Sequence, residues 1–161
     1  MQTTEQKPGR IEPMVSVRSL RLVTYGLGDS YKKKLFKPVR NKSHHNKPLG
    51  GLWSSPVGCK YGWREWSEAE SFGDLSSFFE TEYTGRTLVI DSLSDLAGMA
   101  WRKSEYGRDL PDYEAMAASG IDAIYLTERG QEETRFSQPG LYGYDCECVL
   151  VMNPDCIVAA H

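Results

Sequence analysis

The chain has 161 residues, of which 40% are hydrophobic and 25% are charged, as is usual for a globular protein. No apolar stretch approaches the roughly eighteen residues that a membrane span requires, which argues against an integral membrane protein. The net charge of −3 conceals an asymmetry, because residues 1–64 carry a net charge of +10 and residues 65–161 a net charge of −13.

The N-terminal residues are polar and lack the apolar core of a secretion signal. We therefore expect a flexible arm over 1–13, one folded domain over 14–161 and a cytoplasmic location. The first strand is expected over 15–25, where β-branched residues are frequent and after which glycines follow.

A basic, irregular segment follows over 31–47, and it holds seven Lys or Arg and no Asp or Glu. Such a segment favours an anionic partner, either a nucleic acid or the phosphates of a nucleotide. The alternative is a solvated loop that pairs with the acidic half of the chain.

The remaining pattern alternates between strands and helices. We expect strands over 48–56, 86–91, 121–126 and 144–152, a short edge at 157–158, and helices over 61–72, 92–101 and 111–117. Phe78 and Phe79 continue the apolar face of the first helix, on which Trp63 and Trp66 are interpreted as core residues. No glycine-rich phosphate loop follows a strand, which excludes Rossmann and P-loop folds. The order predicts an α+β fold with mixed sheets.

Two carboxylates stand at the beginning of the last predicted strand. Because side chains alternate along a strand, Asp145 and Glu147 are predicted to share one face with Val149 and Val151. Placing acids at the start of an apolar strand costs free energy of hydration, so we expect these two to have a functional role. The polar stretch 127–143 before them is predicted to be a loop that completes a functional site.

The four cysteines are interpreted as reduced core residues. Cys146 and Cys148 are too closely spaced for a common zinc pattern, and a disulfide framework is not expected without a secretion signal. The pair His44-His45 is too weak a signal to predict a metal site.

Three short motifs occur in a recognisable order, namely 23–26 (VTYG), 51–55 (GLWSS) and 145–147 (DCE). This order resembles the ADP-ribosyltransferase fold, in which a first strand ends at the nicotinamide site, a second carries hydroxyl residues and a late strand carries a glutamate. The resemblance implies two small mixed β-sheets that form a split NAD-binding cleft flanked by helices, with NAD as a substrate.

The resemblance also implies catalytic roles for the two acids. Glu147 would stabilise the oxocarbenium-like ribose that forms when the bond to nicotinamide breaks. Asp145 would orient or deprotonate the acceptor nucleophile, although many family members carry Gln or Glu there. The alternative is that both acids are solvent-facing residues at the start of an edge strand.

Four further residues are implied to bind NAD. Ser54 and Ser55 would hydrogen-bond the nicotinamide ribose or support the glutamate. Tyr25, where the family usually has His or Arg, would stack on nicotinamide, and the main chain of Gly26 would hold its carboxamide. The alternatives are a plain turn at the serines and a core tyrosine at position 25.

The resemblance therefore favours a small mono-ADP-ribosyltransferase of phage or toxin-system type, a glycosyltransferase that acts on a host protein or a nucleic acid and not at a membrane. The alternative is a non-catalytic binding or inhibitor protein of the same fold. It would grip a protein, nucleotide or nucleic-acid partner through its basic N-terminal half.

Overall fold

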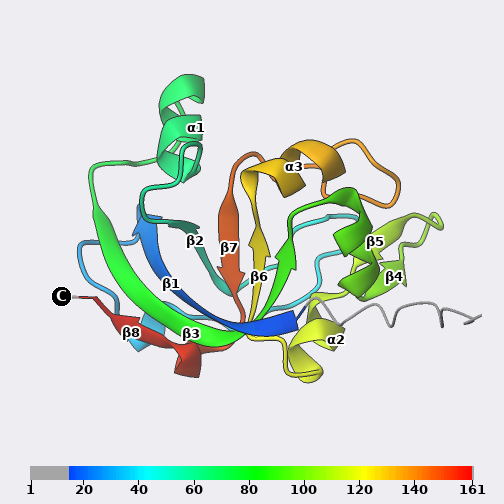
Figure 1. The fold of residues 1–161 in the computed structure, drawn as a ribbon, viewed down its shortest axis with the longest axis horizontal. Coiled ribbons are helices and arrows are strands. Elements are labelled where there is room, and N and C mark those ends of the chain that lie inside the picture. Colours follow the sequence, from blue (N-terminus) through cyan, green and yellow to red (C-terminus); the bar gives the residue numbers. More distant parts are fainter. Residues whose placement is uncertain (1–14, 161) are drawn as a thin grey trace, which may run out of the picture.

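The computed structural model describes residues 15–160 (Figure 1). The arm expected over 1–13 lies outside the described residues. The strands are β1 (Val15–Tyr25), β2 (Leu52–Pro56), β3 (Phe78–Ile90), β4 (Trp101–Lys103), β5 (Asp109–Pro111), β6 (Ala123–Leu126), β7 (Cys148–Val151) and β8 (Ile157–Ala159). The α-helices are α1 (Trp63–Glu70), α2 (Tyr113–Ala118) and α3 (Glu128–Thr134), and the 3-10 turns are η1 (Lys33–Leu35), η2 (Leu93–Gly98) and η3 (Pro154–Cys156).

Five strands form a closed barrel in the order β1-β2-β7-β6-β3. The ring closes because β3 pairs with β1 along the whole length of β1, from Val15 opposite Leu88 to Tyr25 opposite Phe78. Neighbouring strands are antiparallel except β3 and β6, which run parallel. Strand β8 adds to the first half of β3, and β4 and β5 form a separate hairpin.

The predicted α+β fold with two small mixed sheets and a split cleft is therefore wrong. Its main error lies in β3, whose first residues were expected to continue a helical apolar face. Phe79 and Tyr83 are buried while Phe78 and Glu82 are exposed, which is the two-residue alternation of a strand. This 13-residue strand supplies the pairing that turns one sheet into a barrel.

The barrel divides the apolar residues into two cores. The inner core fills the ring of strands and the outer core lies between the outside of the barrel and the surrounding helices and loops. Strand β7 contributes to both, because Val149 and Val151 belong to the inner core and Cys148 and Leu150 to the outer core.

Three other expectations differ from the structure. The helix expected over 92–101 is a 3-10 turn followed by β4, and the last strand begins only at Cys148. The loop expected over 127–143 contains α3. Thr127 caps this helix by accepting a hydrogen bond from the Gly130 amide at 3.0 Å. Gly130 lets the helix approach β3 closely, because a Cβ there would collide with the carbonyl of Ile90.

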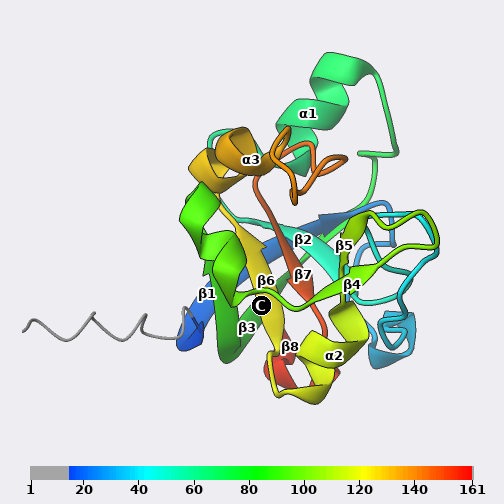
Figure 2. The same ribbon diagram turned by 90° about the vertical axis from the view of Figure 1, so that its right-hand side faces the viewer.

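The helices lie at opposite ends of the barrel. Figures 1 and 2 both place α1 and α3 at the end where β2 finishes and β7 begins, and α2 at the other end. We call the first of these ends the mouth. No helix within residues 15–160 is long and apolar enough to cross a membrane.

Candidate functional site

The three motifs of the sequence meet at the mouth. The hydroxyls of Thr24 and Ser54, both buried, are hydrogen-bonded at 2.7 Å and link the ends of β1 and β2. The hydroxyl of Ser55 donates to the carbonyl of Glu147 at 2.9 Å and links β2 to the residues before β7. The two bonds join residues that are 30 and 92 positions apart in the sequence.

Ser55 also fixes the start of α1. Its hydroxyl oxygen accepts a hydrogen bond from the Trp63 amide at 2.9 Å, and the residue is 2% exposed. Gly62, at the N-cap of α1, leaves room for this contact, because a Cβ there would crowd Ser55 and Cys59. The Ser55 hydroxyl therefore connects β2 to α1 and to the residue before β7. Because it already donates one hydrogen bond and accepts another, it is less available to a ribose than the sequence suggested.

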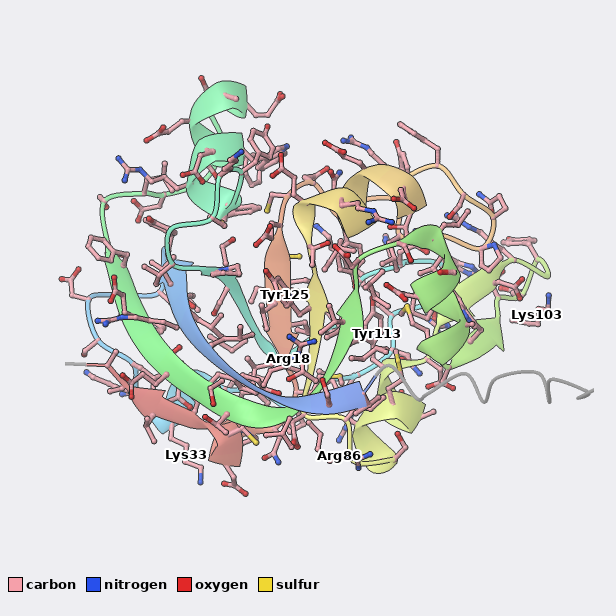
Figure 3. All side chains as sticks on the ribbon, in the orientation of Figure 1. Arg18, Lys33, Arg86, Lys103, Tyr113 and Tyr125 are labelled. Carbon is pink, nitrogen blue, oxygen red and sulfur yellow. The ribbon has the colours of Figure 1, made fainter. Side chains whose placement is uncertain are left out.

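The carboxylate of Glu147 is held by two groups of the protein. The hydroxyl of Tyr125 donates to one oxygen at 2.7 Å, and the amide of Glu128, at the start of α3, donates to the other at 3.1 Å. The Glu147 amide donates to the carbonyl of Tyr61 at 3.0 Å. Burial, followed by the adjacent carboxylate, raises the pKa of the Tyr125 phenol well above its ordinary value, so this group stays a donor. Figure 3 shows Tyr125 within the ring of strands.

Asp145 has a different partner from Glu147. Its carboxylate lies 3.7 Å from the guanidinium of Arg135, and its side chain is 22% exposed. Residues 144–147 precede β7, and the chain bends at Cys146 and Glu147. The prediction that the two acids share a strand face is wrong for this reason, since the strand alternation begins only after them.

Two adjacent cavities open on the outer side of β1 and β2 below α1, and we call them the paired cavities. The first has a volume of about 530 Å³ and the second about 360 Å³. Both are lined by the same four residues, Val23, Tyr25, Ser55 and Trp63. They are therefore neighbouring cavities that have the Tyr25 and Trp63 rings in common.

The first cavity combines an arginine with acids. Arg64 and Glu65 from α1 line it, together with Phe78 and Cys59. Burial, and after it the carboxylates of Glu147 and Glu65, raise the pKa of the Cys59 thiol to about 11. Glu147 lines neither cavity, and the Cys59 thiol is protonated at neutral pH.

The second cavity is walled by aromatic rings and contains one carboxylate. Lys47 lies over the rings of Trp53 and Tyr144, with its Nζ at 5.8 and 5.7 Å from their centroids. Ser54 and Asp145 also line this cavity. Rings and a cation in one cavity suit an aromatic ligand that carries negative charge.

Tyr25 ends β1, and Gly26 follows it. The Tyr25 ring packs against Phe78 at 5.7 Å between centroids and lines both cavities. Burial raises the pKa of its phenol, and the guanidinium of Arg64 partly offsets this. The Gly26 amide already donates to the carbonyl of Ser77 at 3.0 Å, so it is not free for a carboxamide.

Sequence reasoning missed several residues of this site. Tyr125, Arg64 and Lys47 were not assigned to it, and Trp63 was interpreted only as core. Tyr125 carried a signal, since its place in the predicted strand 121–126 puts it on one face with buried Ala123. Arg64 and Lys47 carried none, because nothing local relates them to β1 or β7.

The four cysteines have free thiols, two of which are buried in the outer core. Burial raises the pKa of the Cys146 thiol to about 12. Within residues 15–160 no group of three or more His, Cys, Asp or Glu side chains could hold a metal ion. No protein-family model, curated protein or solved structure matches the chain.

Proposed function

We propose that the protein is a mono-ADP-ribosyltransferase that cleaves NAD, releases nicotinamide and transfers ADP-ribose to an acceptor. The observation that carries this proposal is the meeting of the three motifs at the mouth, through the Thr24–Ser54 and Ser55–Glu147 hydrogen bonds. The pairing of β1 with β2 and of β2 with β7 brings these motifs together in the barrel. A cytoplasmic enzyme of phage or toxin-system type belongs to the same proposal.

The paired cavities support NAD as the donor. NAD consists of two nucleotides, each with a flat ring system, joined by a pyrophosphate. The cavities share the Tyr25 and Trp63 rings, with Lys47 in one and Arg64, which is paired with the exposed Glu68 at 3.1 Å, in the other. Aromatic walls stack on bases, and the two cations suit the pyrophosphate.

The two acids flank these cavities in positions that suit different steps. Glu147 lines neither cavity, but Ser55, which lines both, binds its main-chain carbonyl, and we assign to its negative charge the stabilisation of a developing oxocarbenium ion. Its hydrogen bonds to Tyr125 and Glu128 set its orientation before substrate arrives. Asp145, on the wall of the second cavity, orients the acceptor nucleophile.

A non-catalytic nucleotide-binding protein is the second candidate. One observation favours it, because both oxygens of the Glu147 carboxylate are already bound by protein groups. In that case the carboxylate holds α3 against the mouth, and the paired cavities bind a ligand without cleaving it.

The test is nicotinamide release from NAD, measured by chromatography alongside thermal stabilisation by NAD. We expect release by the wild type and a loss of about a hundredfold or more in Glu147→Gln, because glutamine keeps the size but not the charge. Glu132→Gln is the matched control, since Glu132 is an exposed acid on α3. Stabilisation by NAD without nicotinamide release would favour the binding protein. The absence of both stabilisation and release would refute NAD as the ligand.

A further inference from the structure

The basic segment 31–47 is an ordered part of the structure. Arg40 and Leu49 exchange two main-chain hydrogen bonds of 2.9 and 2.8 Å, which fold the chain back on itself. The Gly51 amide donates to the carbonyl of Lys37 at 2.7 Å. Gly50, at φ +76°, packs so closely that a Cβ would collide with the carbonyl of Pro38.

The segment is also fastened to α2. The side-chain amide of Asn41 donates to the Asp112 carboxylate at 2.9 Å, and its oxygen accepts from the Tyr113 amide at 2.8 Å. The main-chain amide of Asn41 donates to the carboxylate of Glu114 at 3.2 Å. A flexible solvated loop would not have this set of bonds, so the cations stand on a fixed scaffold.

The side chains of the segment are largely without ionic partners. Its lysines and arginines form one ion pair within residues 15–160, between Lys33 and Asp155 at 3.2 Å. Both members are more than 70% exposed, so the pair is weak and another anion can replace it. Lys32, Lys34 and Lys37, which are close to Lys33 in the sequence, are also exposed. Among the described residues the segment thus pairs with the acidic half only in part, through the exposed Lys33–Asp155 pair and a His44–Glu105 contact at 3.5 Å.

A groove of about 550 Å³ lies beside these cations. Its floor is apolar, with Phe36 from the segment, Ala117 from α2 and Met152 after β7. Its rim carries Lys33 and Arg40, and one acid, Glu114, whose carboxylate accepts the bond from the Asn41 amide. Figure 3 shows Lys33 directed away from the barrel.

We propose that this groove and the surrounding lysines bind single-stranded nucleic acid. Phosphates pair with the exposed cations, and an unstacked base enters the apolar groove beside Phe36. A duplex keeps its bases stacked inside and cannot fill such a groove. An acidic peptide without aromatic or apolar side chains would use the cations but would leave the apolar floor unfilled. This binding needs no NAD and stands apart from the chemistry proposed at the mouth.

The experiment measures fluorescence anisotropy of a labelled oligothymidylate of about 12 nucleotides, without NAD, between about 50 and 200 mM salt. We expect binding whose logarithmic salt slope falls by about two in the triple variant Lys33→Gln/Lys34→Gln/Lys37→Gln, because each phosphate contact on a single strand contributes about 0.7. The charge-matched control is Arg18→Gln/Lys60→Gln/Arg108→Gln, which removes three exposed cations outside the segment. Its slope should match that of the wild type.

A second variant tests the groove independently of charge. Phe36→Leu keeps the apolar volume but removes the ring, and we expect about fivefold weaker binding at constant salt. A labelled duplex and heparin serve as competitors. Equal competition by duplex or heparin at matched charge, or equal loss in both triple variants, would overturn the proposal.

Discussion

At the mouth of the barrel the polar side chains bind one another, whereas in the basic segment the main chain is bound and the side chains reach solvent. Glu147 has partners for both carboxylate oxygens, and Ser55 both donates and accepts. In the basic segment, Lys33 alone of the lysines and arginines has an acidic partner within residues 15–160. Substitutions at the mouth should therefore change stability and geometry, and substitutions in the segment should change binding and its salt dependence.

The sharpest test of the mouth is Tyr125→Phe, which removes the hydroxyl that donates to Glu147. A hydrogen bond to a charged group contributes about 1.5–3 kcal/mol, and we expect the free energy of unfolding to fall by that amount. Nicotinamide release, where present, should fall about tenfold as the carboxylate loses its orientation. Denaturant unfolding and the chromatographic assay measure the two effects.

Tyr142→Phe is the control for this prediction, because Tyr142 is 57% exposed. We expect a change within about 0.5 kcal/mol for that variant. Equal effects at the two tyrosines would show that the Glu147 carboxylate is not held by Tyr125, and the contrast between mouth and segment would then lose its main support.

A smaller effect is expected for Ser55→Ala. The substitution leaves the Glu147 carbonyl and the Trp63 amide without their partner in a buried place, and we expect a loss of about 1–2 kcal/mol of stability. Ser43→Ala makes the same chemical change at an exposed position in the basic segment and should be near neutral. If Ser55→Ala leaves the free energy of unfolding unchanged, water replaces the hydroxyl and these two hydrogen bonds are not needed for stability.

The sequence predicted the individual strands and helices better than the closure of the strands into a barrel. The alternation of Val149 and Val151 with Cys148 and Leu150 located β7, and the apolar spacing of Trp63 and Trp66 located α1. The barrel depends on β3, whose inner face includes the polar Thr81 and Thr87, so its pattern is weaker than that of an apolar strand. Its pairing with β1 joins residues more than 50 apart, and no local rule specifies such a pairing.

The candidate site was only partly predicted, because it too depends on contacts between distant segments of the chain. Order along the chain brought Tyr25, Ser55 and Glu147 into one proposal, and the barrel joins their strands. What failed was the direction of Asp145, because extended alternation was assumed where the chain bends before β7. Lys47 reaches the second cavity only through the folding back of the basic segment, which depends on the Arg40–Leu49 bridge.

The smallest expected effect concerns the Cys59 thiol, which reports the charge behind the first cavity. Burial is the largest cause of its raised pKa of about 11, and the Glu147 carboxylate adds to it. Removing that negative charge in Glu147→Gln makes the thiolate less unfavourable, so the pKa should fall, by less than about one unit because burial remains. The pH dependence of iodoacetamide alkylation, followed at Cys59 by mass spectrometry, measures it.

The same thiol has a consequence for stability against pH. Its pKa is near 9 in the unfolded chain and about 11 in the folded protein, so the unfolded chain loses this proton first as the pH rises. The contribution is fully present below pH 9 and is lost between pH 9 and 11. Cys59→Ala should therefore flatten the decline in stability across that interval, whereas Glu147→Gln should shift its upper limit downward. An alkylation profile that is unchanged in Glu147→Gln would place the carboxylate away from Cys59, and it would contradict the proposed action of the Glu147 charge at the first cavity.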